Sequence, residues 1–368
     1  MHFDRRLATN FDWGTLFLTL AITAISVILL YSATAYRTDG LANIYLKQLS
    51  WIGIGLICMF TVLLVDYQVL CRYALVLYGC TIIGLIAVLL FGQVINGAQR
   101  WLVLGPWQLQ ISEFVKPVLI LILARYFAED TQQNDAALGF RDLLLPVLFV
   151  ALPFLLIAKQ PDLSTSMVLL AILSAMLVMV RLQKKMLLLL SILTTCTLPA
   201  AWYVLAEYQR DRLLSLFNPH SDLLGTGYHS WQSKIAIGSG GLWGKGLLAG
   251  TQSRLHFLPE RHTDFIFSVL GEELGFIGVL ILLGLFASLL AHSFATAYHS
   301  RDRLGVFVTI GVITMLTTHI FLNIGMTTGL LPIVGLPLPL LSYGGSSLVA
   351  TFLSLGLVMN VHMRRFKF

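Results

Sequence analysis

Apolar residues in this chain come in long blocks that are separated by shorter polar segments. Most blocks approach the roughly 20 residues that a helix needs to cross a bilayer, and a soluble core does not use apolar runs of this length. We therefore predict an all-α polytopic membrane protein with a single domain over residues 1–368. The ten predicted spans are residues 11–32, 50–65, 73–91, 113–127, 143–158, 163–180, 186–205, 264–291, 304–326 and 346–363.

Composition supports this class and excludes several others. Hydrophobic residues make up 57% of the chain and charged residues 11%, and the mean hydropathy is +0.82. These values exclude a disordered chain, a collagen-like fibre and an ordinary soluble enzyme. The net charge of +6 would suggest nucleic acid for a soluble chain, but basic cytoplasmic loops produce the same excess. We therefore expect no nucleic-acid partner.

The distribution of basic residues sets the expected orientation. With the N-terminus placed in the cytoplasm, 13 of the 24 Lys and Arg residues fall in cytoplasmic segments, and five fall in short outer loops or span ends. The others lie in the outer loop 207–263, and long loops cross the membrane largely regardless of charge. Both termini are therefore predicted to be cytoplasmic, with one large extracytoplasmic loop between spans seven and eight.

The first unusual outer segment, residues 96–117, contains Arg100, Trp101 and an acid–base pair. Glu113 and Lys116 are three residues apart, so they share one face of a helix and can pair. One interpretation is a structural ion pair at a helix end. The other is a polar wall of a substrate groove, because ionisable groups at membrane depth are costly and usually face a cavity.

The outer loop 207–263 is too long for a simple connection. Its aromatic residues, among them Trp231 and Trp243, indicate that it packs on itself or on the membrane. Residues 236–246 within it have the sequence A-I-G-S-G-G-L-W-G-K-G. One interpretation of this segment is a flexible glycine-rich linker. The other is a turn that contains Lys245 and whose backbone amides approach a diphosphate.

Ionisable residues crowd the end of that loop, in L-P-E-R-H-T-D-F-I-F at residues 258–267. Asp264 stands at the expected start of span eight, where the helix dipole favours an anion. Thr263 and Asp264 would also serve simply as helix N-caps. Glu272 lies about 12 Å further along the helix and Glu273 points nearly opposite to Asp264. The three acids are therefore not expected to form one cluster, and either glutamate can instead bond to a neighbouring helix.

The third unusual segment, residues 329–347, is apolar, yet its three prolines forbid a regular helix. Non-helical backbone at membrane depth is tolerated only inside protein or along a cavity. We therefore expect a re-entrant or surface-dipping segment beside the site rather than a free loop. His319 and Asn323, in span nine, are interpreted as interhelical hydrogen-bond partners rather than as a site.

These segments resemble those of the SEDS family (shape, elongation, division and sporulation). The similarity covers nearly the whole chain and includes the ten-span plan. Ser164 departs from the family pattern, which usually has Gly there, and the departure is expected to concern the packing of one turn and nothing catalytic. The short N-terminal tail resembles the elongation branch more than the division branch. The shared motifs are N-G-A-Q-R-W at 96–101, S-E-F-V-K-P at 112–117, K-Q-P-D-L at 159–163, the segments 236–246 and 258–267, and P-L-P-L-L-S-Y-G-G-S-S at 337–347.

The resemblance implies a peptidoglycan glycosyltransferase in the inner membrane of a bacterium, with inversion at the transferred sugar. Such enzymes polymerise lipid II, an undecaprenyl-diphosphate-linked disaccharide pentapeptide, at the outer membrane face. They work with a class B penicillin-binding protein and the elongation machinery. The family's acid in L-P-E-x-H-T-D corresponds to Asp264, which is expected to be catalytic. Trp101, Glu113 and Lys116 correspond to further positions that the family treats as functional.

The residues are consistent with this chemistry. The acceptor hydroxyl is a poor nucleophile until a base takes its proton. Asp264 can be that base, or it can ligate a divalent cation such as Mg²⁺ or Mn²⁺, which binds oxygen ligands. The diphosphate leaving group needs positive charge. Candidates on the same side are Arg100, Lys116, Lys245, Arg254 and Arg261, and His262 and Ser342 complete the set of expected substrate-binding residues.

Two other functional classes stay open at this point. One is a transporter, in particular a flippase for the same lipid, and the other is a non-catalytic scaffold for the penicillin-binding protein. Transporter sites lie near the bilayer midplane on interrupted helices in repeated halves, whereas the polar residues here crowd the outer ends of the spans. A scaffold would not need the ionisable cluster around Asp264.

Overall fold

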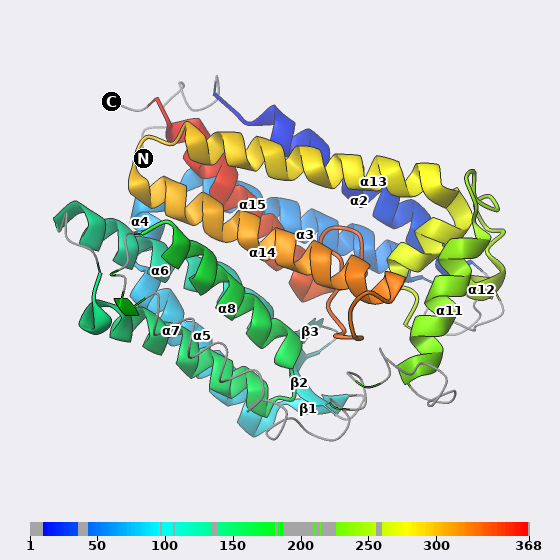
Figure 1. The fold of residues 1–368 in the computed structure, drawn as a ribbon, viewed down its shortest axis with the longest axis horizontal. Coiled ribbons are helices and arrows are strands. Elements are labelled where there is room, and N and C mark those ends of the chain that lie inside the picture. Colours follow the sequence, from blue (N-terminus) through cyan, green and yellow to red (C-terminus); the bar gives the residue numbers. More distant parts are fainter. Residues whose placement is uncertain are drawn as a thin grey trace.

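A computed structural model describes residues 10–35, 43–95, 98–105, 107–133, 138–180, 183, 185–186, 210, 214, 226–254 and 260–366. Figure 1 shows long helices that run side by side. The start of the first of these helices and the end of the last lie at one end of the bundle. At the other end lie α11 (Thr226–Ser239) and α12 (Thr251–Arg254).

Within the described residues, seven helices are long and apolar enough to cross a membrane, as expected for a multi-pass membrane protein. Two more helices, α6 (Ile111–Gln133) and α8 (Leu163–Val178), also overlap predicted spans. A further short helix, α4 (Tyr67–Arg72), lies between the predicted spans 50–65 and 73–91. The predicted span 186–205 lies outside the described residues apart from its first residue. The seven are α2 (Trp13–Thr34), α3 (Ile44–Leu64), α5 (Ala74–Phe91), α7 (Phe140–Lys159), α13 (Ile266–Tyr298), α14 (Arg303–Thr328) and α15 (Gly345–Arg364).

Several helices extend beyond the predicted spans into polar sequence. α3 begins at Ile44 rather than at residue 50, α6 continues to Gln133, and α13 continues to Tyr298. A hydropathy criterion leaves polar residues out of a predicted span, but such residues can still continue the backbone hydrogen bonding of the helix. In α3 the polar Gln48 is fully buried because its amide has protein acceptors, including the backbone oxygen of Ser342 at 3.3 Å.

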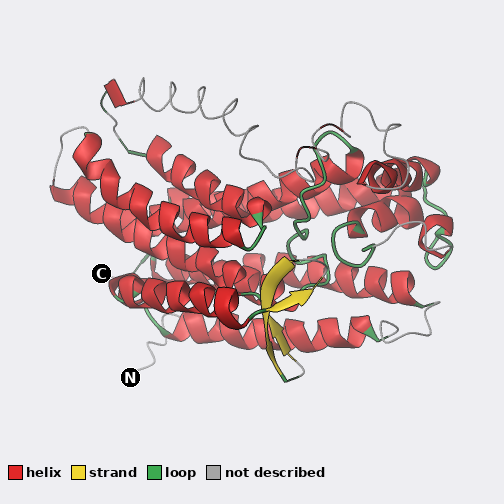
Figure 2. Cartoon of the chain, turned by 90° about the horizontal axis from the view of Figure 1, so that it is seen from below, coloured by secondary structure: helices red, strands yellow, loops and turns green. Residues whose placement is uncertain are grey.

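A small antiparallel sheet corrects the all-α prediction. Its strands are β1 (Gln93–Ile95), β2 (Ala98–Leu104) and β3 (Trp107–Leu109), in the order β1-β2-β3. Figure 2 shows the strands beside the helices. Gly105 adopts a left-handed φ of 62° just after β2, which is the conformation that a tight hairpin turn requires. Hydropathy reasoning missed these short strands because they lie between two apolar helices.

The core of the bundle is built around α15. In the most apolar stretch of α15, 83% of the residues are buried within the protein, whereas 22% are buried in the corresponding stretch of α5. α15 packs against α3, α6 and α14. Since α15 directly follows the proline-containing segment, that segment is held close to the centre of the bundle.

The segment between α14 and α15 is non-helical, as the sequence predicts, and most of its second half is buried. α14 ends with Gly329 in the left-handed conformation, at a φ of 72°, which is a common way to stop a helix. Leu336, Leu338 and Leu341 that follow are all nearly inaccessible to solvent. We refer to residues 330–344 as the buried loop.

Candidate functional site

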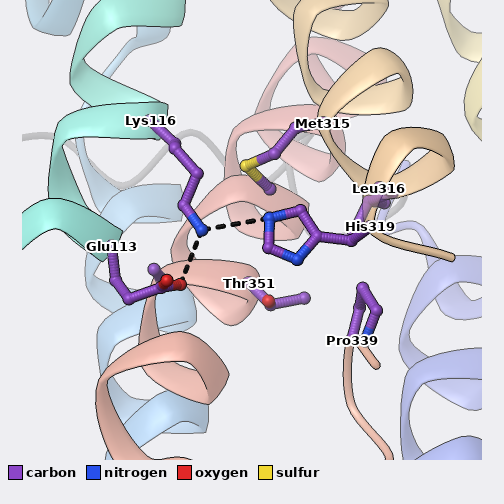
Figure 3. Close-up of a pocket in the computed structure, with 8 residues that line it drawn as sticks. Glu113, Lys116, Met315, Leu316, His319, Pro339 and Thr351 are labelled. Carbon is purple, nitrogen blue, oxygen red and sulfur yellow. Dashed lines mark hydrogen bonds and ion pairs between the residues drawn. The ribbon is translucent and has the colours of Figure 1, made fainter. Parts of the chain in front are cut away.

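A buried ion pair lies near the start of α6. Lys116 Nζ donates to Glu113 Oε2 at 2.7 Å, and the two side chains are 2% and 3% exposed. The same nitrogen lies 3.0 Å from Nε2 of His319, which α14 contributes. Figure 3 shows Lys116 between the other two side chains. The predicted pair therefore forms, and the pocket it faces is completed by Met315, Leu316, Pro339, Ala350 and Thr351.

The ammonium group of Lys116 determines which nitrogen of His319 carries the proton. A lysine ammonium only donates hydrogen bonds, so Nε2 of His319 must accept. The proton then sits on Nδ1, which lies 3.4 Å from the backbone oxygen of Pro337 in the buried loop. His319 thereby connects the ion pair to the buried loop. The sequence interpretation as an interhelical partner holds, but the position of His319 in the pocket was missed because Lys116 is 203 residues away in the sequence.

Asp264 lies in the turn just before α13 and is partly exposed. α13 has Phe265 at its N-cap position, without a side-chain cap bond. The alternative in which Thr263 or Asp264 caps the helix is therefore wrong, because the helix starts later than the sequence suggests. The carboxylate faces the buried loop, since a Cβ added to Gly335 would lie 3.4 Å from Asp264 Oδ2.

The turn that carries Asp264 is fastened to the buried loop by hydrogen bonds. Ser342 Oγ donates to the backbone oxygen of Thr263 at 2.6 Å and accepts from the amide of Leu338 at 2.8 Å. The amide of Tyr343 donates to the backbone oxygen of His262 at 2.9 Å. Ser342 and His262, both predicted from sequence, are therefore next to Asp264. The Ser342 hydroxyl holds the turn in this structure.

Asn323 adds a further bond between α14, the turn and the buried loop. Its Nδ2 donates to the backbone oxygen of Asp264 at 3.0 Å and to that of Leu336 at 2.7 Å. Asn323 lies four residues after His319, so both project from one face of α14. The expected hydrogen-bonding role of Asn323 is confirmed. The same face of α14 thus contacts the ion pair and the Asp264 turn.

Arg100 and Trp101 lie on β2, and Arg100 contacts the segment that follows α7. Its Nε donates to the backbone oxygen of Gln160 at 3.1 Å, and another guanidinium nitrogen donates to that of Pro161. Its Nη1 lies 3.9 Å from Asp162 Oδ1. The structure thus brings together two of the motifs, N-G-A-Q-R-W and K-Q-P-D-L. The guanidinium is partly exposed, so it can still meet a ligand.

The glycine-rich turn at 240–246 docks against a break in α13. Gly275 interrupts the helix with a φ of 65° and a ψ of −162°. Such a break leaves backbone groups without helical partners, and the turn supplies them. The bonds are Lys245 N to Glu272 O at 3.0 Å, Gly246 N to Glu273 O at 2.9 Å, Phe276 N to Gly241 O at 2.9 Å and Ile277 N to Leu242 O at 3.2 Å.

This docking corrects the interpretation in which these amides approach a diphosphate. The amides of Lys245 and Gly246 already donate to α13. The glycines are needed instead for close backbone contact, because a Cβ on Gly244 would lie 2.1 Å from the backbone oxygen of Glu273. The segment is therefore neither a flexible linker nor an anion cradle.

The side chain of Glu272 strengthens the same contact, whereas that of Glu273 bonds to α2. Lys245 Nζ donates to Glu272 Oε1 at 2.7 Å, and Glu272 is fully buried. Ser32 Oγ, from α2, donates to Glu273 Oε1 at 2.6 Å. The prediction that one of these acids bonds a neighbouring helix is confirmed for Glu273. The charge of Lys245 is paired with Glu272 in this structure.

The surroundings of Asp264 decide whether it could hold the predicted metal ion. Arg261, in the same turn, is buried, and the side chain of Arg254 lies outside the described residues. Among the described residues, three or more His, Cys, Asp or Glu side chains converge at metal-binding distance elsewhere and not at Asp264. Mg²⁺ is commonly held by one or two carboxylates plus substrate phosphates. The partly exposed carboxylate of Asp264 fits that arrangement.

Comparisons with known proteins agree over nearly the whole chain. The family model for FtsW, RodA and SpoVE, described as a cell cycle protein, matches residues 13–367. The peptidoglycan glycosyltransferase MrdB of Escherichia coli (strain K12) is 40% identical over 97% of this chain and 94% of its own length. The peptidoglycan glycosyltransferase RodA of Treponema pallidum (strain Nichols) is 32% identical, over 98% and 99%.

Solved structures give the same result. A chain from a peptidoglycan synthase complex superposes with a TM-score of 0.81 at 34% identity, covering 97% of this chain and 99% of the other. The rod-shape-determining protein RodA of Thermus thermophilus superposes with a TM-score of 0.72 at 33% identity, over 97% and 98%. This chain therefore belongs to the FtsW/RodA/SpoVE family of multi-pass bacterial membrane proteins, which is the SEDS family that its sequence motifs resemble.

Proposed function

We propose that this protein is a peptidoglycan glycosyltransferase that polymerises lipid II into glycan strands during cell elongation. The observation that carries the proposal is the placement of Asp264. Its turn is held by Ser342 and Asn323, its carboxylate faces the buried loop, and α14 joins it to the buried Glu113–Lys116 pair. The relatives named peptidoglycan glycosyltransferases match along almost the entire chain.

In the proposed reaction, Asp264 acts as the general base. The 4-hydroxyl of the acceptor sugar attacks the anomeric carbon of the donor, and the bond from that carbon to the diphosphate breaks. The hydroxyl proton passes to the Asp264 carboxylate, and the diphosphate departs with the bonding electrons. A single displacement inverts the anomeric configuration. Losing such a base typically costs roughly 10²–10⁴-fold in rate.

Further residues are assigned to substrate binding. Arg100 and Trp101 on β2, with Arg261 and His262 beside Asp264, are proposed to bind the headgroup, because diphosphate needs cationic donors. Lys116 is proposed to act through the ion pair rather than by direct contact, since its ammonium already has two partners. Mg²⁺ or Mn²⁺ bound by Asp264 and the diphosphate would neutralise part of the negative charge on the leaving diphosphate.

The proposal includes the membrane topology. Ten spans in one domain, both termini in the cytoplasm and an extracytoplasmic loop at 207–263 would place Asp264 at the outer face. A single cysteine at Gln183 should then label only from the cytoplasm, and one at Thr251, in α12, only from outside. Labelling of either position from the opposite side would overturn the orientation.

We also propose a class B penicillin-binding protein as the partner that crosslinks the glycan. The support is the similarity to a chain from a peptidoglycan synthase complex. Together with the elongation machinery, such a partner would couple polymerisation to crosslinking. The lipid tail of the substrate can stay in the bilayer beside the helices.

The decisive experiment is a polymerisation assay on the purified protein with labelled lipid II. Asp264→Asn should abolish polymer formation while leaving expression and apparent melting temperature unchanged. The matched control is Glu260→Gln, which removes the same charge from an exposed side chain of the same turn. Near-normal polymerisation by Asp264→Asn would remove the base assignment. Absence of polymer from the wild type, alone and with its partner, would favour a flippase or a scaffold instead.

A further inference from the structure

Two histidines and a buried aspartate converge at the end of the bundle where α2 begins and α15 ends. His292 Nε2 lies 2.7 Å from Asp12 Oδ1, and His362 Nδ1 lies 3.8 Å from Asp12 Oδ2. One ligand atom from each residue lies within 4.8 Å of the others. Along α13, His292 is about 40 Å from Asp264. The cluster is therefore separate from the proposed active site.

The local structure brings the three side chains together. Asp12 is the N-cap of α2, where it accepts from Thr15 N at 3.0 Å and from Thr15 Oγ1 at 2.7 Å. Gly14 leaves room for the imidazole, since a Cβ there would lie 2.9 Å from Cε1 of His292. The rings of His292 and His362 stack with their centroids 5.7 Å apart. Three helices distant in sequence thus present one carboxylate and two imidazoles to a common point.

The capping role of Asp12 does not account for both histidines. The hydrogen bonds that Asp12 accepts from Thr15 are already sufficient for its role as a helix cap. The 3.8 Å separation of His362 Nδ1 from Asp12 is too long for a hydrogen bond. Thr296 Oγ1 lies 3.1 Å from that nitrogen, but it also lies 3.2 Å from the backbone oxygen of His292, to which it can donate instead. When Thr296 donates to His292, the lone pair of His362 Nδ1 is available to a cation.

The spacing suits a tetrahedral metal ion. Ligand atoms at about 2.0–2.1 Å from such an ion are about 3.3 Å apart. The Asp12–histidine separations are 2.7 Å from Oδ1 to His292 and 3.8 Å from Oδ2 to His362, on either side of this value. With one ligand atom taken from each residue, all three lie within 4.8 Å of one another, so small side-chain movements would bring them to this spacing. Imidazole ligands favour zinc and similar transition metals over Mg²⁺ and Ca²⁺, which prefer oxygen.

We propose that Asp12, His292 and His362 bind one divalent transition metal ion, with zinc as the expected metal. The His292 side chain is 35% exposed, so water can occupy the fourth position. The ion would join α2, α13 and α15, and so fasten the beginning of the chain to its last helix. Because a ligand that binds only the folded state stabilises it, zinc should raise the apparent melting temperature.

The experiment uses the full-length protein in detergent, purified with an affinity tag that contains no histidine and stripped with a chelator. Zinc content is measured after addition of Zn²⁺ and removal of excess, and Co²⁺ is used as a spectroscopic probe. We expect about one Zn²⁺ per chain, intense visible absorption bands typical of tetrahedral Co²⁺, and a higher melting temperature with Zn²⁺.

The variants separate a metal site from a purely hydrogen-bonded cluster. Loss of a hydrogen-bonding partner of a ligand already weakens metal binding about 10–100-fold, so His292→Gln and His362→Gln should weaken zinc binding by at least that much. Asp12→Asn keeps a good N-cap and should also lose the ion. The matched control is His299→Gln, which should keep the ion, because the exposed His299 ring bonds to the backbone oxygen of Ala295 on its own helix.

Several results would overturn the proposal. Equal zinc binding by wild type and His292→Gln would place the ion elsewhere. Absence of binding and of any zinc-dependent rise in melting temperature would reduce the cluster to a hydrogen-bonded contact between helices. Size-exclusion profiles confirm that each variant is folded before its metal content is compared, and Asp12→Asn keeps the test decisive if a histidine variant does not fold. None of these outcomes depends on the polymerisation assay.

Discussion

Neutralising Glu113 should leave Lys116 as a buried cation without its anionic partner. The Lys116 side chain is 2% exposed, and its second contact is the neutral Nε2 of His319 at 3.0 Å. Removing one member of a buried pair costs about 3–5 kcal/mol. In Glu113→Gln an amide oxygen can still accept from Nζ, so we expect about 3 kcal/mol. At roughly 2 °C per kcal/mol, the apparent melting temperature should fall by about 6 °C.

A double-mutant cycle tests whether the loss comes from the pair. Lys116→Met removes the cation, so the double variant with Glu113→Gln contains no unpaired charge and should be more stable than the sum of the single losses predicts. We expect a coupling free energy of about 2 kcal/mol. The control is Glu129→Gln, on the same helix, whose pair with Arg125 at 2.8 Å is exposed. Its loss should be below about 1 kcal/mol.

The assay combines thermal unfolding in detergent with lipid II polymerisation. Glu113→Gln should reduce polymerisation partially, because the pair positions α6 against α14 and does not transfer a proton in the proposed reaction. Equal melting temperatures for Glu113→Gln and Glu129→Gln would refute the buried-pair reasoning. Complete inactivity of Glu113→Gln at an unchanged melting temperature would make Glu113, rather than Asp264, the candidate base.

Two further predictions concern the backbone around the site. Gly275→Ala should lower the melting temperature in a thermal scan, because φ is 65° and the new Cβ would lie 2.2 Å from the amide nitrogen of Gly244. The control Gly284→Ala, where a Cβ on the same helix meets open space, should leave the melting temperature unchanged. Ser342→Ala removes the hydroxyl that fastens the Asp264 turn, which should cost about 1–3 kcal/mol and lower the polymerisation rate. Ser288→Ala, whose hydroxyl is exposed and bonds within α13, should leave both values unchanged, and equal effects of the two serine variants would contradict the positioning role.

Local sequence pattern was sufficient for most of the helical framework. Apolar blocks predict α2 and α5 to within a few residues, because a bilayer-spanning helix needs a long continuous apolar run. The buried loop was also predictable, since prolines forbid a helix and the flanking residues are too apolar for an exposed loop. The sheet was not, because three short strands between apolar helices give no comparable signal.

The contacts within the site could not be predicted in the same way. That Glu113 and Lys116 pair follows from their spacing, but the approach of His319 depends on how α14 packs against α6. The glycine-rich turn was misinterpreted for a similar reason. Its amides have partners because α13 breaks at Gly275, and a single glycine in a long apolar stretch does not reveal a break. Local patterns identify the groups, whereas long-range packing decides which groups meet.

The packing of α14 explains why two polar groups that are far apart in the sequence act on one region. His319 and Asn323 are one helical turn apart, and they bond respectively to the ion pair on α6 and to the turn that carries Asp264. Both also contact backbone oxygens of the buried loop. A displacement of α14 would therefore move the loop, the pair and the turn together. Such a shared support fixes the turn that carries Asp264 relative to the ion pair and the buried loop, as the proposed role of Asp264 as a general base requires.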